Sequence, residues 1–298
     1  MHLESKRVDI RAVFMGVAFA FMWSSAFTSA RIIVEYASPL WALSLRFLIS
    51  GLLGVMIARL MGQTWALTRN QWRATIVFGL CQNALYLGLN FVAIQTIEAS
   101  LAAIIASTMP LLVAVAGWLF FRDKVKPLAL AGLIAGVIGV SIIMGARLNG
   151  GVDIYGLGLC LIGVLALTTA TLVLRGATSG GNFLMVVGLQ MLVGSFALFL
   201  AAVFFETPQV QMSTPLVLAF IYTTLVPGLA ATLVWFFLVD RIGAVKAATF
   251  HFLNPFIGVA IAAVVLREAL DWHDFLGVAI IAFGILAVQL SKQKPTPS

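Results

Sequence analysis

The chain has 298 residues, of which 62% are hydrophobic and only 10% are charged, and its formal net charge is +7. A soluble domain carries about 25% charged residues, so this composition excludes a water-soluble protein and requires a lipid bilayer as the surrounding partner. The positive charge does not indicate nucleic acid, because the basic residues lie in short loops between apolar runs.

Ten segments are long and apolar enough to cross a bilayer as helices, which takes roughly 20 residues each. The first segment follows basic residues in the manner of a signal sequence, but it is longer than a signal sequence and further spans follow, so we interpret it as a retained helix. The tail after Ser291 is predicted to be disordered. The predicted spans, in chain order, are 12–34, 39–60, 73–95, 99–121, 127–146, 153–174, 183–204, 215–238, 244–266 and 273–290.

The loop charges predict the orientation. Fourteen of the 18 Lys and Arg residues lie on the side of the N-terminus, whereas only Arg31, Arg147 and Arg267 lie on the other side and Arg46 lies inside a span. Because cytoplasmic loops carry the excess of positive charge, both termini are expected in the cytoplasm.

The segment 98–140 reappears as 243–285, shifted by 145 residues. In both copies an apolar helix carries a proline, ends at a basic–acidic pair and precedes a second apolar helix. Residues 1–148 and 149–298 therefore form two repeats of five spans each. An odd number of spans means that the second repeat enters the membrane from the opposite side, so the sequence predicts an all-α membrane protein built from two inverted five-helix repeats. This architecture is typical of alternating access around a site near the bilayer midplane.

Three short motifs resemble the drug/metabolite transporter superfamily, specifically its ten-helix EamA-like branch. They are Trp23-Ser24-Ser25-Ala26-Phe27 in the first span, Leu45-Arg46-Phe47 in the second, and Phe121-Arg122-Asp123 after the proline of the fourth, which the ninth span echoes. The resemblance covers the whole chain and implies export of metabolites from the bacterial cytoplasm across the inner membrane. Within the branch the chain most resembles the aromatic amino-acid exporters. The sixth span has Thr168-Thr169 where the first has Ser24-Ser25, so the tryptophan signature is not repeated.

The third span carries a polar stripe, because Gln82, Tyr86 and Asn90 recur every four residues with Asn83 beside them. Polar side chains are costly in hydrocarbon and tend to face a cavity, so this stripe is expected to line the substrate path. The alternative is hydrogen bonding between helices, which needs no substrate.

Two prolines lie at equivalent positions of the repeats. Pro110 follows Ser107 and Thr108, and Pro255 follows His251 and Asn254. A proline lacks an N–H and frees the carbonyl four residues earlier, so both sites could receive a substrate ammonium or act as hinges. They could also be packing kinks, and His251 could carry a coupling proton or simply donate and accept hydrogen bonds.

Further candidates complete the expected cavity. Trp23 and Trp235 could form flat walls for an aromatic substrate, although Trp235 could instead belong to the interfacial belt. Pro227 is a third expected helix break. Arg46 could bind a substrate carboxylate or pair within the protein. The remaining polar candidates are Ser24, Thr168 and Thr224.

The acidic residues all lie outside the middles of the spans, which argues against a proton-coupled exporter of organic cations and favours a neutral or zwitterionic solute. A sugar, purine or neutral-drug exporter is the alternative within the superfamily. A membrane enzyme would need a catalytic or metal cluster, but His2, His251 and His273 are scattered, and Cys81 and Cys160 lie far apart. No metal or cofactor is therefore expected.

A passive scaffold is a third class of function. The polar stripe argues against it, because polar residues within the membrane are costly and a scaffold has no need of them. The oligomeric state is expected to be a monomer or a weak homodimer, because the Gly132–Gly136 pair serves either close helix packing or a dimer face.

Overall fold

The computed structural model describes residues 9–173 and 181–292, which contain ten membrane-spanning helices and no β-strand. The predicted all-α class is confirmed, and the predicted tail lies outside the described residues from residue 293 onwards. The elements are α1 (Ile10–Tyr36), α2 (Pro39–Leu60), α3 (Arg69–Phe78), η1 (Gly79–Tyr86), α4 (Leu87–Ala93), α5 (Ala99–Ser107), α6 (Met109–Phe121), α7 (Pro127–Asn149), α8 (Ile154–Val173), α9 (Phe183–Phe205), α10 (Thr214–Leu225), η2 (Val226–Ala230), α11 (Ala231–Ile242), α12 (Ala244–Ala247), η3 (Ala248–Leu253), α13 (Asn254–Leu266) and α14 (Trp272–Ser291).

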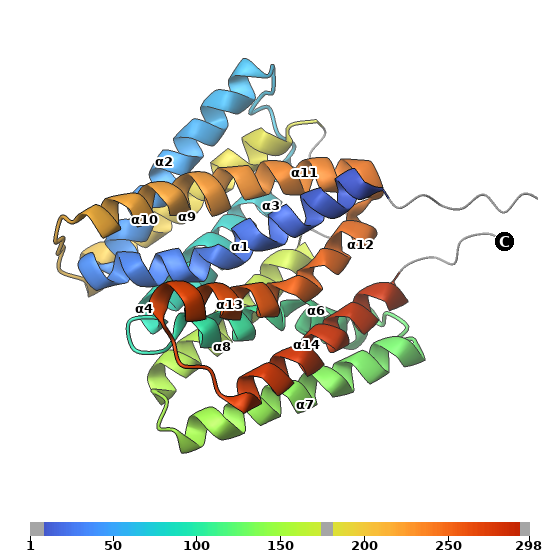
Figure 1. The fold of residues 1–298 in the computed structure, drawn as a ribbon. Coiled ribbons are helices and arrows are strands. Elements are labelled where there is room, and N and C mark those ends of the chain that lie inside the picture. Colours follow the sequence, from blue (N-terminus) through green and yellow to red (C-terminus); the bar gives the residue numbers. More distant parts are fainter. Residues whose placement is uncertain (1–8, 174–180, 293–298) are drawn as a thin grey trace, which may run out of the picture.

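The first and last helices place the described ends of the chain at one end of the bundle, as Figure 1 shows. We call this the terminal end. Because α1 starts there, each odd-numbered span runs away from the terminal end and each even-numbered span runs back towards it. This alternation allows the depth of a residue in the bundle to be judged from its position along its helix.

Four spans are interrupted near their middles. The fourth span breaks at Thr108, just before Pro110, and the ninth passes through the 3-10 helix η3 just before Pro255. The eighth contains the π-helix η2 with Pro227, and the third contains the longer π-helix η1. Prolines explain three of the breaks, because each removes a backbone donor. The π-helix η1 contains no proline, and π-helical turns are frequent at functional sites.

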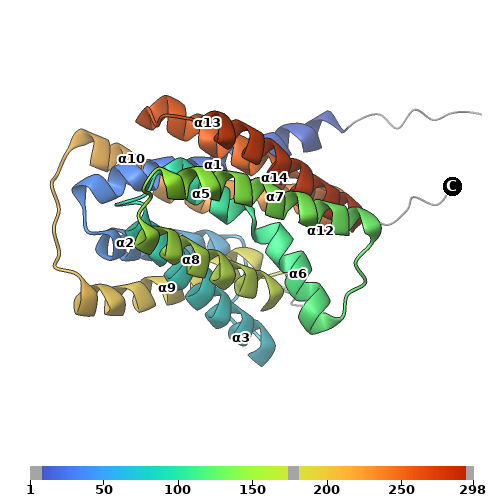
Figure 2. The same ribbon diagram turned by 90° about the horizontal axis from the view of Figure 1, so that it is seen from below.

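Helices α7 and α14 pack side by side in both ribbon views (Figures 1 and 2), and glycines make this approach possible. A Cβ atom placed on Gly139 would lie 2.8 Å from the carbonyl oxygen of Gly277, and the reverse distance is also 2.8 Å. The pair Gly132 and Gly284 meets in the same reciprocal way at 2.6 Å. Residue numbers therefore rise along α7 while those of the contacted residues fall along α14, so the two helices are antiparallel.

This glycine pairing also confirms the inverted repeat. The 145-residue shift converts Gly132 into Gly277 and Gly139 into Gly284, so each glycine contacts the equivalent of the other. Such an exchange is what a two-fold axis produces. Gly132 packs within the chain, and Gly136 faces Leu111 of α6, so the GxxxG pair serves close intramolecular packing.

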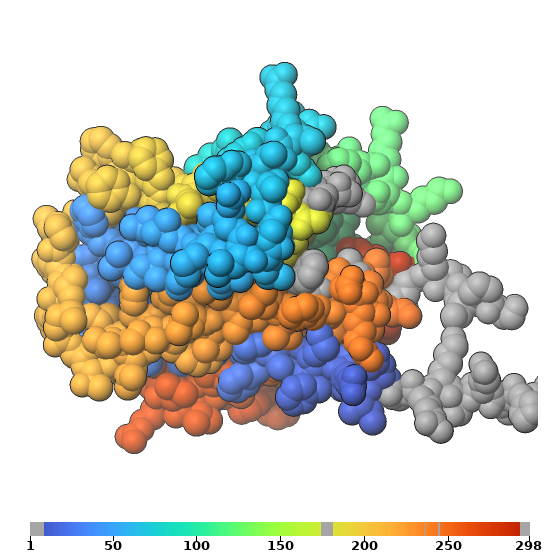
Figure 3. Space-filling view, turned by 90° about the horizontal axis from the view of Figure 1, so that it is seen from above, coloured from blue at the N-terminus to red at the C-terminus, as the bar shows by residue number. Residues whose placement is uncertain are grey.

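Helices α2 and α9 form a second antiparallel pair across the repeats. The Ser44 hydroxyl donates to the carbonyl of Ser195 at 2.9 Å, and the Ser195 hydroxyl donates back to the carbonyl of Ser44 at 2.8 Å. Gly51 and Gly188 meet two turns further along this contact. Figure 3 shows α2 lying beside the α10–α11 span on this face, so α2 is held between two helices of the second repeat.

Candidate functional site

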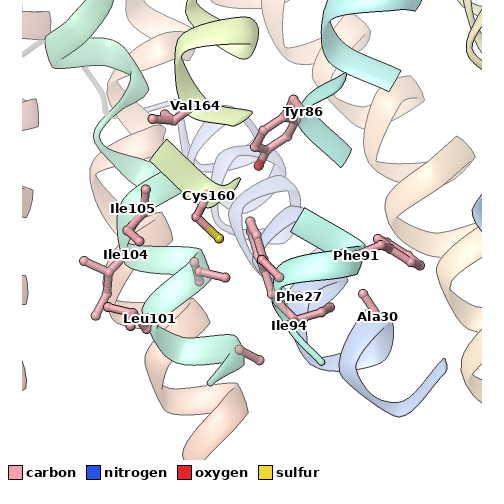
Figure 4. Packing of buried hydrophobic residues seen from close by; sticks show 14 of the residues in the cluster. Phe27, Ala30, Tyr86, Phe91, Ile94, Leu101, Ile104, Ile105, Cys160 and Val164 are labelled. Atoms are coloured by element: carbon pink, nitrogen blue, oxygen red, sulfur yellow. The ribbon is translucent and has the colours of Figure 1, made fainter. Parts of the chain in front are cut away.

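A central cavity lies between the repeats and consists of two neighbouring lobes. The empty volume is about 760 Å³ around the first lobe and about 410 Å³ around the second, and both values include space open to solvent. Trp23, Phe27 and Tyr86 line both lobes and separate them. Figure 4 shows Phe27 and Tyr86 reaching the buried cluster from different elements, with Cys160 to one side of them. A substrate that occupied both lobes would therefore cross an aromatic wall.

The two π-helices line the first lobe. Gln82 and Tyr86 come from η1, and Pro227 and Gly228 come from η2. The wider π-turn changes which side chains of a helix share one face, so both stretches present residues that a continuous α-helix would direct elsewhere. The first lobe is therefore built where both helices depart from α-geometry.

Among the residues that the structure describes, Arg46 is the one charged residue that lines the first lobe. Its side chain is only 5% exposed, its Nε donates to the carbonyl of Thr223 at 3.2 Å, and its guanidinium lies 4.9 Å from the ring centre of Phe47. Within residues 9–173 and 181–292, no carboxylate forms an ion pair with Arg46. A buried cation is costly without a countercharge, and among the described residues Arg46 has no carboxylate to supply one.

The polar stripe of the third span serves two roles at once. All four of its residues line the first lobe. The Asn83 amide donates to the carbonyl of Gln190 at 3.0 Å, and the Asn90 amide donates to the carbonyl of Tyr86 at 2.8 Å. The Asn83 bond joins the third span to α9, and the Asn90 side-chain oxygen accepts from the Cys160 thiol of α8 at 3.4 Å. Gln82 and Tyr86 form no side-chain bond between helices within the described residues.

The second lobe is lined by the helix breaks of the fourth and ninth spans. Pro110, Ser107, His251 and Asn254 all face it, together with Ser24 of α1. The Ser24 hydroxyl donates to the backbone carbonyl of Asn254 at 3.3 Å, and the side-chain amide nitrogen of Asn254 lies 3.0 Å from Nδ1 of His251. The amide oxygen of Asn254 is buried and has no hydrogen-bond partner among the described residues.

An aromatic cluster closes the second lobe towards the terminal end. The ring centre of Phe19 lies 5.7 Å from that of Trp23, 4.7 Å from that of Trp235 and 5.4 Å from that of His251. Phe19 lies near the start of α1, and Trp235 lies in the last two turns of α11. Trp235 lines neither lobe. It packs within this aromatic cluster, between the cavity and the terminal end of the bundle.

Three predicted lining residues face their own helices instead. Thr108, Thr168 and Thr224 each donate a hydroxyl hydrogen bond to a carbonyl three or four residues earlier, and none lines a lobe. A hydroxyl that donates to its own helix in this way needs no hydrogen-bond partner from a neighbouring helix. Pro255 breaks its helix but also lies outside both linings.

Other lining residues escaped the sequence prediction. They include Phe27, Gln190, Met191 and Thr232. Gln190 is the single glutamine of an apolar span, which is a usable signal. The apolar residues carry no signal, because lipid-facing and cavity-facing side chains look alike in sequence.

Comparisons with known proteins agree along the full length of the chain. The sequence profile of the EamA-like transporter family matches residues 10–145 and 154–290. The chain is 26% identical to the uncharacterized transporter YvbV of Bacillus subtilis, over 90% of the chain and 88% of the relative. It is 24% identical to protein PagO of Salmonella typhimurium, over 98% and 97%.

The uncharacterized inner membrane transporter YedA of Escherichia coli is 26% identical, over 93% of the chain and 90% of the relative. A crystal structure matches the fold with a TM-score of 0.69 at 18% identity, over 94% of this chain and 97% of the other. At that identity the likeness concerns the fold alone. None of these names states a substrate.

Proposed function

The chain belongs to the EamA-like transporter family, and on that premise we propose that it exports small zwitterionic metabolites, amino acids above all, through the central cavity by alternating access. In this proposal the terminal end faces the cytoplasm of a bacterial cell, and the protein spans the inner membrane. The family fixes the class of protein, and the substrate proposal depends on the cavity.

The unpaired Arg46 is the single observation that carries the proposal. Its Nε is anchored on Thr223, so the two terminal nitrogens have a defined position in the first lobe. A carboxylate can accept from both of them in the bidentate geometry that arginine favours. An anionic group from the substrate would thereby supply the missing partner of a buried cation.

The second lobe supplies a complementary acceptor. The partnerless amide oxygen of Asn254 is suited to an ammonium group. Among the described residues, neither lobe is lined by Asp or Glu, so a solute with a net positive charge would find no countercharge. A molecule with one carboxylate and one ammonium matches these groups, and the wall formed by Trp23, Phe27 and Tyr86 favours an apolar or aromatic side chain.

The test is a flux assay with purified protein in liposomes. Labelled phenylalanine, threonine and methionine should cross faster than in empty vesicles, and phenylalaninamide, which lacks the carboxylate, should compete at least tenfold less well than phenylalanine. Equal competition by the amide would contradict the role of Arg46. Absence of accelerated flux for every amino acid would refute the substrate proposal. An imposed pH gradient, present or absent, separates proton coupling from facilitated efflux.

A neutral solute is the second candidate. Gln82 and Gln190 line the first lobe with amides, which can bind sugar hydroxyls or the edge of a purine. Sugars, purines and neutral drugs therefore belong in the same competition panel, and their displacement of phenylalanine would favour this alternative.

A further inference from the structure

A large vestibule lies at the end of the bundle opposite the terminal end. Its lining comes from the end of α1, the start of α2, the end of the third span, the start of α8 and the loop that follows α9. Its empty volume is about 1530 Å³, which includes space open to solvent. Because the aromatic cluster around Phe19 packs between the cavity and the terminal end, the vestibule is the nearer way out of the cavity in this state.

A partition one helical turn thick separates the vestibule from the first lobe. Ala30 lines the lobe, whereas Val34, one turn further along α1, lines the vestibule. Ile94 and Val92 divide in the same way at the end of the third span. Ala30 is 3% exposed and Ile94 is 1% exposed, and Figure 4 shows both in the buried cluster. One turn rises about 5.4 Å, so a small movement of either helix would connect the two spaces.

Arg31 joins the two helices at the level of this partition. Its Nη1 donates to the backbone carbonyl of Ile94, and its Nε lies 3.4 Å from Oε1 of Glu35. Ile94 is the C-cap residue of α4, and carbonyls at the end of a helix lack partners within it and attract cations. Among the described residues, no other side-chain hydrogen bond joins α1 to α4 or to the turn that follows it.

The vestibule has two walls, and each is held together by its own contacts. The loops after α1 and α9 form one wall, in which the Ser38 amide donates to the carbonyl of Gln209 at 3.0 Å. The end of the third span and the start of α8 form the other wall, in which the Thr96 hydroxyl donates to the Asp153 carboxylate at 2.6 Å. The Arg31 bond crosses from the first wall to the second, so its release would free one wall to move as a unit.

We propose that Arg31 closes a gate between the first lobe and the vestibule, and that Glu35 receives its guanidinium when the gate opens. In the state seen here, Arg31 holds the Ile94 carbonyl against α1. In the open state, Ile94 moves away with the α8 wall, Arg31 stays on α1 as the partner of Glu35, and substrate passes from the first lobe into the vestibule. Arg31 is a positioning residue, because it lines neither lobe.

Two cysteine reporters on α1 test the gate without any substrate. Ala30→Cys reports on the lobe side of the partition and Val34→Cys on the vestibule side. Both are made after Cys81 and Cys160 are replaced by serine, which keeps a donor for the Asn90 oxygen that the Cys160 thiol contacts. N-ethylmaleimide is added to the protein in lipid nanodiscs. The Val34 reporter should react at least about tenfold faster than the Ala30 reporter.

Arg31→Met removes every donor of the gate while it keeps most of the side-chain volume. It should raise the labelling rate of the Ala30 reporter about tenfold and leave that of the Val34 reporter unchanged. Glu35→Gln removes the charge that competes for the guanidinium, so Arg31 stays on Ile94 and the Ala30 reporter should react about threefold more slowly. General loosening of the helices would instead raise the rate in both variants.

Arg267→Met is the matched control. It removes the same charge at the same end of the bundle, but Arg267 lines neither the vestibule nor a lobe. Labelling of both reporters should stay at the parent rate. The gate would be overturned by an unchanged Ala30 reporter in Arg31→Met, by an equal rise in both reporters, by a rise in Glu35→Gln, or by an equal effect of Arg267→Met.

The inference rests on passage through the central cavity, as in the proposed function, but not on the identity of the substrate. Failure of amino-acid flux together with the expected labelling pattern would refute the substrate alone. Accelerated flux together with an Ala30 reporter that does not respond to Arg31→Met would refute the gate alone.

Discussion

Replacement of Arg46 by methionine should abolish discrimination for a substrate carboxylate. The two unit charges would lie about 4 Å apart, where the attraction is about 4 kcal/mol at an effective dielectric constant of 20. Desolvation of the carboxylate returns part of this energy, so we take about 3 kcal/mol as the net loss, which corresponds to roughly 150-fold in apparent affinity. Methionine keeps most of the side-chain volume while it removes the charge.

The assay compares phenylalanine with phenylalaninamide in both proteins. In the parent protein, phenylalanine should compete far better than the amide. In Arg46→Met, the two should compete equally, because the variant lacks the group that tells them apart. Arg59→Met is the matched control, since Arg59 stacks on Trp65 outside the cavity, with its guanidinium 4.9 Å from the ring centre.

A stability measurement separates binding from folding. Arg46 lacks a carboxylate partner, so its removal costs mainly the hydrogen bond to Thr223, about 1 kcal/mol. The loss of an uncompensated buried charge offsets that cost. The melting temperature should therefore change little. The reasoning would be refuted if Arg46→Met retained the preference for phenylalanine over its amide, or if the variant unfolded.

Three further outcomes are expected. Gly139→Leu should destabilise the protein by about 1–3 kcal/mol through overpacking, because its Cβ would meet the Gly277 carbonyl at 2.8 Å, whereas Gly145→Leu, with nothing within 4 Å, should leave the thermal melt unchanged. Asn254→Ala should weaken competition by phenylalanine about tenfold but spare its deaminated analogue, hydrocinnamate; equal losses would deny the ammonium role. Burial raises the pKa of Glu206 above its ordinary value of 4.5, so its contribution to stability is complete below pH 4.5 and is lost as the pH rises through the raised pKa. The melting temperature of the parent protein should therefore fall relative to that of Glu206→Gln over this range, and a rise would show that the sign is wrong.

The architecture could be read from the chain because each of its determinants is local or periodic. Span length, apolar composition and turn residues predict the ten helices. The shift by 145 residues, combined with five spans per repeat, predicts the inversion that the exchanged pairs of Gly132 and Gly139 display. Pro110, Pro227 and Pro255 mark helix breaks, since the missing N–H is a property of the residue itself.

The composition of the cavity depended on contacts between spans far apart in sequence. Thr168 and Trp235 carry the same chemistry as residues that line the lobes, but one bonds to its own helix and the other stacks on Phe19. The π-turns of η1 re-aim side chains in a way that no proline signals.

Arg46 shows most clearly the difference between what the sequence determines and what contacts between distant helices determine. The sequence places a cation within a span, but whether a carboxylate meets it depends on which helices surround α2. Similarly, the bond between Glu268 and Ala99 joins residues 169 positions apart. Hydropathy and repeat symmetry act along the chain, whereas partners for buried charges and amides are assigned only when distant helices pack together.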